Sequence, residues 1–363
     1  MVTARGIARV GGGARQNLVP LLFAVICITG ILWANISIPF LLTDVVPRVA
    51  RNLFLVLSLI VPVVAGMGLN FGIVIGAMCG QVGLILVENA GGQGLGALFL
   101  AMAFSLPLSL LFGWMTGLLL NRAKGREMIT GLILGFFANG IYQAVFLLMA
   151  GSILPFRNQE LLLDGGVGLA NSINLVGTGQ RLDHLIRPSF KVSIFTIYLP
   201  VATFLVSILL CFATRWYLRT KSGQDLRTVG QDMHVAEIAG VGVDRARVRA
   251  IMISTCLGGI GQIIFLSSWG TFNTYQSHEQ VGPYAIAALL VGGATVVRAN
   301  IWHAILGTIL FHTLISVVAT AAQTLVPASM GGAQIGEYIR EFLVYAVIAV
   351  TLALHAWKAK RRT

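Results

Sequence analysis

The sequence predicts an all-α, polytopic membrane protein with about ten transmembrane helices. Two features of the composition indicate this fold class: 56% of the 363 residues are hydrophobic and only 10% are charged, whereas soluble domains average about 25% charged residues. A third observation is a series of apolar runs, most of them close to the roughly 20 residues that cross a bilayer. An ordinary soluble enzyme is excluded because it needs more polar surface. A disordered chain is excluded because it needs low hydrophobicity.

The predicted spans follow one another along the chain. They are 18–36, 52–68, 70–87, 95–120, 129–151, 193–214, 247–268, 283–297, 302–323 and 339–357. The second and third are nearly continuous and could form one broken helix, and the short eighth could be re-entrant. The first run is too long for a typical signal peptide and no small-residue cleavage site follows it, so we expect an uncleaved first span.

Basic residues predict the sidedness of the bundle. Ten spans place both termini on one side, and a cytoplasmic N-terminus puts 18 of the 25 Lys and Arg residues in cytoplasmic segments. We therefore expect a cytoplasmic segment 1–17, a single transmembrane domain 18–357 and a basic cytoplasmic tail 358–363. The domain would carry an outer loop 152–192 and a cytoplasmic loop 215–246. The net charge of +12 then comes from basic residues that flank membrane spans. We therefore expect the lipid bilayer, and no nucleic acid, as a partner.

A glycine-rich segment follows the second span. Four of its glycines recur at every fourth position: Gly68, Gly72, Gly76 and Gly80. On a helix they would share one face and permit close contact with another backbone, which is one interpretation. The other is a helix break near 66–70, because exposed backbone at membrane depth is tolerated only against protein or a water-filled path. On that interpretation Gly68, Asn70, Phe71 and Gly72 are candidates for a translocation pathway, with Gln81 about three turns further along the same face.

The sequence predicts no catalytic site, metal site or cofactor. Its six histidines form no HExxH motif, and its four cysteines lie in apolar runs as packing residues. The chain contains no Gly-Lys dipeptide and hence no Walker A motif, so any ATP would be bound by another chain. No Asp or Glu falls near the middle of a predicted span, which argues against proton-driven transport and intramembrane catalysis. This absence does not exclude a sodium site built from carbonyl and hydroxyl oxygens.

Residues 226–249 predict a short helix within the cytoplasmic loop. Asp232 is placed to cap a helix from Met233 to Ala239, which Gly240 would end. A short amphipathic helix held parallel to the membrane can dock into a groove on a soluble partner. The other interpretation is a solvated connection.

Three motifs carry a family resemblance. The first motif lies in the cytoplasmic loop and its immediate continuation and consists of Arg227, Gly230, Ala236, Gly240, Val241, Val243 and Arg245. The second motif is the glycine-rich segment that begins at Leu290. The third is Gly68-Leu-Asn-Phe-Gly, which occupies the place of an early helix break. Together they resemble permease subunits of ABC importers of the ribose/branched-chain amino acid superfamily. The sequence departs from the ribose-type and nucleoside-type motifs around Asn70 and Phe71, so these motifs leave the substrate open.

The resemblance implies one permease subunit of a bacterial inner-membrane importer with the type II importer architecture. Its partners would be a second permease subunit, identical or related, two ABC ATPase subunits, and a periplasmic or lipid-anchored substrate-binding protein. The loop residues expected to contact the ATPase are Asp232, His234, Val235, Ala236, Glu237 and Ile238. A simple sugar or nucleoside is the expected substrate, with a branched-chain amino acid or riboflavin-like ligand as the alternative. The alternative from another class is a self-contained secondary transporter or channel.

Overall fold

The computed structural model describes residues 18–192, 195–325 and 332–360. The predicted N-terminal segment 1–17 and the end of the tail, 361–363, lie outside the described residues. The chain divides into two compact units. Unit 1 comprises Met1–Val49, Ser189–Tyr198 and Tyr284–Thr363, and unit 2 comprises Ala50–Pro188 and Leu199–Pro283.

Helices make up most of the described chain, as the composition predicts. They are α2 (Leu18–Trp33), α3 (Ile38–Ser58), α4 (Ile60–Val64), α5 (Ile73–Asn89), α6 (Gly94–Arg122), α7 (Glu127–Ala144) with its π-helical continuation η1 (Val145–Met149), α8 (Arg181–Leu185), α9 (Val201–Tyr217), α10 (Lys221–Gln231), α11 (Met233–Ile238), α12 (Val243–Trp269), α13 (Val281–Val291), α14 (Ile301–Leu325) and α15 (Gly332–Lys360). A short 3₁₀ helix, η2 (Gln159–Leu161), lies in the predicted outer loop.

Five helices of the described chain, counting α3–α4 and α7–η1 as one each, are long and apolar enough to cross a membrane: α3–α4, α6, α7–η1, α12 and α14. The pair α9–α10, bent by 75°, is a sixth candidate, and α2, α5 and α13 are shorter apolar helices. The chain is therefore a polytopic helical membrane protein, while the total of ten spans stays a prediction. The predicted sidedness of the termini likewise stays a prediction.

The start of the second predicted span is wrong. The predicted span begins at residue 52, whereas α3 begins at Ile38. The preceding residues include Asp44 and Arg48, which are typical of a loop, yet they pair one helical turn apart at 2.8 Å. The second carboxylate oxygen of Asp44 accepts a hydrogen bond from Ser316 Oγ at 2.6 Å. These contacts let polar residues lie within an apolar helix.

The strict all-α prediction also needs correction, because the described part of the chain contains four short strands, which form two antiparallel two-stranded sheets. Strand β1 (Ser172–Asn174) pairs with β4 (Thr271–Asn273), and β2 (Ser189–Val192) pairs with β3 (Phe195–Tyr198). Strand β3 occupies the beginning of the predicted span 193–214, and α9 starts only after Pro200. Aromatic and β-branched residues favour the strand, and proline is suited to the entry of the helix that follows.

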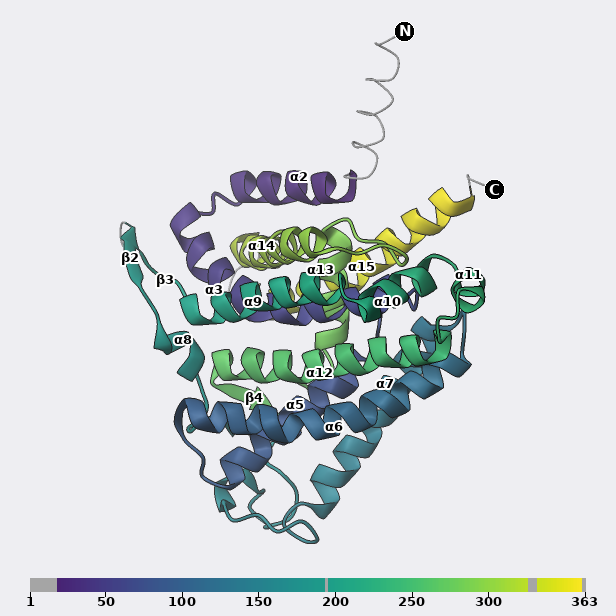
Figure 1. Cartoon of the computed structure of the whole chain (residues 1–363). Coiled ribbons are helices and arrows are strands. Elements are labelled where there is room, and N and C mark those ends of the chain that lie inside the picture. The colour runs from purple at the N-terminus through teal and green to yellow at the C-terminus, as the bar shows by residue number, and fades with distance from the viewer. Residues whose placement is uncertain (1–17, 193–194, 326–331, 361–363) are drawn as a thin grey trace. The chain divides into compact units, whose positions relative to one another are not determined.

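Helices α5, α6 and α12 lie side by side at the centre of unit 2 (Figure 1). A Cβ added to Gly76 would lie 2.3 Å from the Thr255 carbonyl oxygen, and one on Gly80 would lie 2.4 Å from that of Gly259. Glycine thus permits α5 and α12 to touch backbone to backbone, which confirms the close-contact interpretation for these two positions. The interpretation that all four glycines lie on one helix is wrong, because Gly68 and Gly72 precede α5, which begins at Ile73.

Glycine also sets a close contact in unit 1, where α14 packs against α2 and α15. Gly292 directly follows α13, and a Cβ there would lie 1.9 Å from the His303 carbonyl oxygen on α14. A Cβ on Gly307 would lie 2.0 Å from the Ala288 carbonyl oxygen. The late glycine-rich segment therefore brings the backbones of α13 and α14 together.

Candidate functional site

The first candidate site is the connection between α9 and α12, formed by α10 and α11. Helix α11 begins at Met233, as predicted, and ends at Ile238, one residue before the predicted end. Asp232 Oδ1 accepts hydrogen bonds from the backbone N–H groups of His234 at 2.8 Å and Val235 at 3.1 Å. These bonds satisfy two of the N–H groups that a helix start leaves without partners. The predicted cap is confirmed.

Helix α11 has one buried residue and an otherwise exposed surface. Ala236 is fully buried and packs into a cluster that includes Leu226 and Val229 of α10. The remaining predicted contact residues are exposed: Asp232, His234, Val235, Glu237 and Ile238. Val235 is 55% exposed and Ile238 75% exposed. Two uncovered apolar side chains beside charged and polar groups suit a helix that docks onto another protein.

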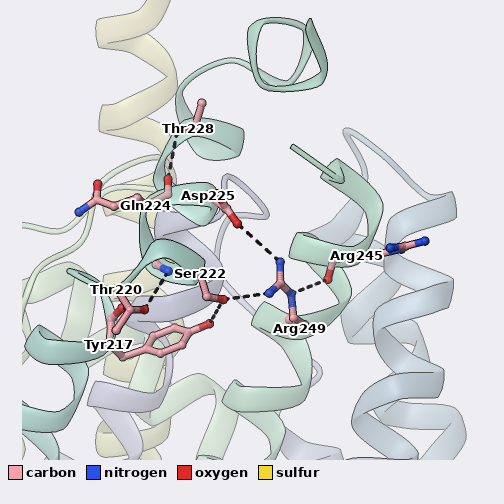
Figure 2. Close-up of polar contacts among 9 residues, drawn as sticks. Tyr217, Thr220, Ser222, Gln224, Asp225, Thr228, Arg245 and Arg249 are labelled. Atoms are coloured by element: carbon pink, nitrogen blue, oxygen red, sulfur yellow. Dashed lines mark hydrogen bonds and ion pairs between the residues drawn. The ribbon is translucent and has the colours of Figure 1, made fainter. Parts of the chain in front are cut away.

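Polar contacts hold α10 against the first turns of α12 (Figure 2). Arg249 donates from Nη1 to Ser222 Oγ at 3.0 Å and lies 4.0 Å from Asp225. Ser222 also bonds the Tyr217 hydroxyl at 3.1 Å, near the end of α9. Within α12, Arg249 Nε donates to the Arg245 carbonyl oxygen at 3.3 Å. The α10 segment is therefore tied to α9 and α12 together.

A buried arginine forms a second connection at the base of this site. Arg247 of α12 is fully buried. Its guanidinium pairs with Glu127, the first residue of α7, and donates to Asn121 Oδ1 of α6 at 2.9 Å. It also lies 3.5 Å from the sulfur of Met233, the first residue of α11. One side chain thus contacts α6, α7 and α11. This buried position is not predictable from the sequence, because an arginine at a helix end is normally an exposed flanking charge.

The break before α5 lies against α10. Gly66 and Gly68 both have φ +72°, a backbone conformation that favours glycine. A Cβ on Gly66 would lie 2.9 Å from Gly230 Cα, and a Cβ on Gly230 would lie 2.0 Å from the Val64 carbonyl oxygen. The backbones of the break and of α10 therefore touch directly, and only glycine fits at Gly230.

Asn70 occupies the interior of the same break. Its side chain is 4% exposed, and Nδ2 donates to Ser254 Oγ of α12 at 3.1 Å. Its Oδ1 is buried without a hydrogen-bond partner among the described residues. Gly68 is buried, Phe71 is half-buried, and a Cβ on Gly72 would lie 3.1 Å from Asn70 Oδ1. The structure brings these four residues together, and their role in a pathway stays a prediction.

A second polar cluster lies between α5, α7 and the segment that joins α12 to α13. His278 is fully buried, with Nδ1 2.6 Å from Gln81 Oε1 and Nε2 2.7 Å from Asn139 Oδ1. Asn139 Nδ2 donates to the Glu279 carboxylate at 2.5 Å. The ring centroid of Tyr142 lies 4.8 Å from that of His278. We name these five residues the His278 cluster.

The His278 cluster corrects an expectation from the sequence. No carboxylate was expected near the middle of a span, yet Glu279 reaches Asn139, near the middle of α7–η1. Glu279 was missed because it belongs to non-helical chain between α12 and α13, so it lies in no apolar run. The signal that was available is the polar content of residues 271–280, which separate two apolar helices.

The long apolar helices, with polar groups buried between them at the α10–α12 connection and in the His278 cluster, define a multi-pass helical membrane protein. A family model described as "branched-chain amino acid transport system / permease component" matches residues 41–352. The chain belongs to this family, the ABC importer permeases of the branched-chain amino acid and ribose type.

The curated relatives are described as permease proteins of autoinducer 2 import systems. The chain is 27% identical to the autoinducer 2 import system permease protein LsrD of Photorhabdus luminescens over 80% of this chain and 76% of the relative. It is 25% identical to the LsrD protein of Yersinia enterocolitica over 74% of this chain and 76% of the relative. The LsrC permease protein of an Enterobacter species is 30% identical over 53% of this chain and 50% of the relative. No solved structure gives a significant match.

Proposed function

We propose that this chain is the membrane-spanning permease subunit of an ATP-driven importer in a bacterial inner membrane, with α10 and α11 on the cytoplasmic side. The observation that carries the proposal is helix α11, which is capped by Asp232, anchored through buried Ala236 and exposed elsewhere. A short helix of this kind offers a firm contact surface to a soluble partner. Family membership supports an ABC ATPase subunit as that partner.

The contact surface would be the exposed side of α11, formed by Asp232, His234, Val235, Glu237 and Ile238. Ala236 would hold this surface in position from within. ATP binding and hydrolysis take place on the partner, so this chain is a transport subunit and not an enzyme. The other partners are a second permease subunit, identical or related, and a periplasmic or lipid-anchored substrate-binding protein.

Movement of α11 would reach the membrane helices through two contacts. One is the backbone contact between Gly230 and the break at Gly66. The other is the buried Arg247, which touches α6, α7 and α11. Gly68, Asn70, Phe71 and Gly72 would then change their exposure to the pathway as the subunit alternates between two states. The ATPase has to favour a different state in each nucleotide condition.

The substrate would be a simple sugar or nucleoside delivered by the binding protein. The names of the relatives, which are permeases for autoinducer 2, are the reason to include small diffusible signals among the ligands to be screened. Branched-chain amino acids and riboflavin-like ligands form the comparison set.

The test is purification of the chain from native membranes in mild detergent, with its partners identified by mass spectrometry. We expect an ATPase with a Walker A motif and an exported binding protein, which can then be screened for its ligand. The variant Glu237→Lys should lose ATPase docking or uncouple hydrolysis from transport. Glu160→Lys, an exposed glutamate in the 152–192 loop, is the matched control and should keep the ATPase. Recovery of the chain alone, with uptake by ATP-free liposomes, would instead identify a secondary carrier.

A further inference from the structure

The His278 cluster lies at mid-depth of a membrane span. Asn139 is twelve residues after Glu127 and ten before Met149, the two ends of α7–η1. At 1.5 Å per residue it stands about 18 Å from one end and about 15 Å from the other. Its hydrogen bond therefore holds the Glu279 carboxylate near the middle of this candidate membrane span.

The cluster has a buried side and an open side. Gln81 and His278 are fully buried, while Asn139 and Gln143 are half-buried and Glu279 is exposed. Gln143 lies one turn after Asn139 and donates to its Oδ1 at 3.3 Å. An exposed carboxylate at this depth is costly against lipid, and such groups face a water-filled cavity or protein. The open side therefore belongs to a water-filled path or to a subunit interface.

The rest of α7 presents a different surface. Ile133 is 62% exposed and Phe137 66% exposed, and both are apolar. They are one turn apart, and Phe137 is about 120° around the helix from Gln143. Helix α7 thus has an apolar stripe suited to lipid or protein and a separate polar stripe at Asn139 and Gln143.

Two buried polar atoms near the cluster have no partner among the described residues. The Tyr142 hydroxyl is one, on a side chain only 6% exposed whose ring packs against His278. The other is Gln262 Oε1 on α12, whose Nε2 donates to the Ser277 carbonyl oxygen beside His278. Buried polar atoms are nearly always hydrogen-bonded, so unpartnered ones point to a ligand or water.

We infer that the open side of the His278 cluster is a substrate-binding site for an uncharged, hydroxyl-rich small molecule. Amide groups donate and accept, and a carboxylate accepts, so together they match hydroxyl groups, which do both. The carboxylate disfavours an anion, and an apolar ligand would leave unmet the donor and acceptor capacity that these groups do not use on one another. This inference rests on the proposed transport function and adds the residues and the ligand class.

The test uses the assembled importer in proteoliposomes, with the four native cysteines replaced by serine. Gln143→Cys and its control Phe137→Cys are treated with the membrane-impermeant thiol reagent 2-sulfonatoethyl methanethiosulfonate. We expect Gln143→Cys to react at least tenfold faster, because it would face water. Millimolar D-ribose or ribitol should slow the labelling of Gln143→Cys at least threefold, and L-leucine should not.

A further variant tests the carboxylate. Glu279→Gln added to Gln143→Cys should keep the labelling and lose the protection by D-ribose or ribitol. Equal labelling at positions 143 and 137 would overturn the site. Protection by L-leucine alone, or by none of the three probes, would overturn the ligand class. ATPase co-purification is an independent readout: its loss refutes the proposed function, whereas its presence with unlabelled Gln143→Cys refutes only this inference.

Discussion

Replacing Gly230 with alanine should separate α10 from the break before α5. The new Cβ would lie 2.0 Å from the Val64 carbonyl oxygen and 3.0 Å from the Gly66 nitrogen. Non-bonded carbon contacts in proteins are about 3.5 Å or longer, so the two backbones must move apart by more than about 1 Å. Neither can yield as a side chain would, because both obstructing groups are main chain.

The cost of such an insertion is about 1 to 3 kcal/mol, the range for overpacking a close contact. This corresponds to roughly a 5- to 150-fold shift in the equilibrium between the docked and undocked positions of α10. Hydrogen exchange of the purified protein measures that shift directly, because amides of α10 and α11 exchange when the segment opens. We expect faster exchange there and little change in α6.

The matched control is Gly242→Ala, in the same connection. A Cβ at Gly242 would meet nothing closer than 3.8 Å, and the contacting atoms belong to the flexible side chain of Arg245. If both variants showed the same exchange rates in α10 and α11, the backbone contact at Gly230 would not restrain this segment. Movement would then not be transmitted through this contact.

Two further predictions, each with its control variants, test the contacts around α11. Asp232→Ala should lower the stability of α11 by about 1 kcal/mol and speed the hydrogen exchange of its first amides. Asp232→Asn keeps an acceptor oxygen and should leave that exchange unchanged. Equal exchange rates in the two variants would contradict the cap. Arg247→Met leaves the nearly buried Glu127 carboxylate unpaired, so it should lower the free energy of unfolding by about 3 to 5 kcal/mol, measured by thermal unfolding. Adding Glu127→Gln to this variant should recover part of the loss. Arg249→Met removes contacts to Asp225, Ser222 and the Arg245 carbonyl oxygen that are all at least partly exposed. It should lower the free energy of unfolding by less than about 1 kcal/mol, so a loss as large as that of Arg247→Met would refute the distinction.

The elements that the sequence predicted well are those set by local chemistry. The start of α11 follows from the hydrogen bonds that Asp232 makes to amides two and three residues away. Gly76 and Gly80 were predictable because helix periodicity alone places them on one face of α5. Neither inference needs knowledge of distant parts of the chain.

The elements that were missed depend on partners far away in sequence. Helix α3 includes Asp44, whose second carboxylate oxygen is satisfied by Ser316, 272 residues later. Glu279 is likewise placed at mid-span by Asn139, 140 residues earlier. A scan for charges within apolar runs cannot find such a carboxylate, because the chain delivers it from a non-helical segment.

The break before α5 is where relative motion of α10 and α12 must be absorbed. Its first part touches α10 at Gly230, and its last part bonds α12 through Asn70 and Ser254. Arg247, about two turns before Ser254, ties the same stretch of α12 to α11. Since both ends of the break are fixed to different helices, displacement of α10 against α12 has to change backbone angles between them. Gly66 and Gly68 supply that freedom at φ +72°. We therefore expect the surroundings of Asn70, whose buried Oδ1 has no partner among the described residues, to change when α11 is moved.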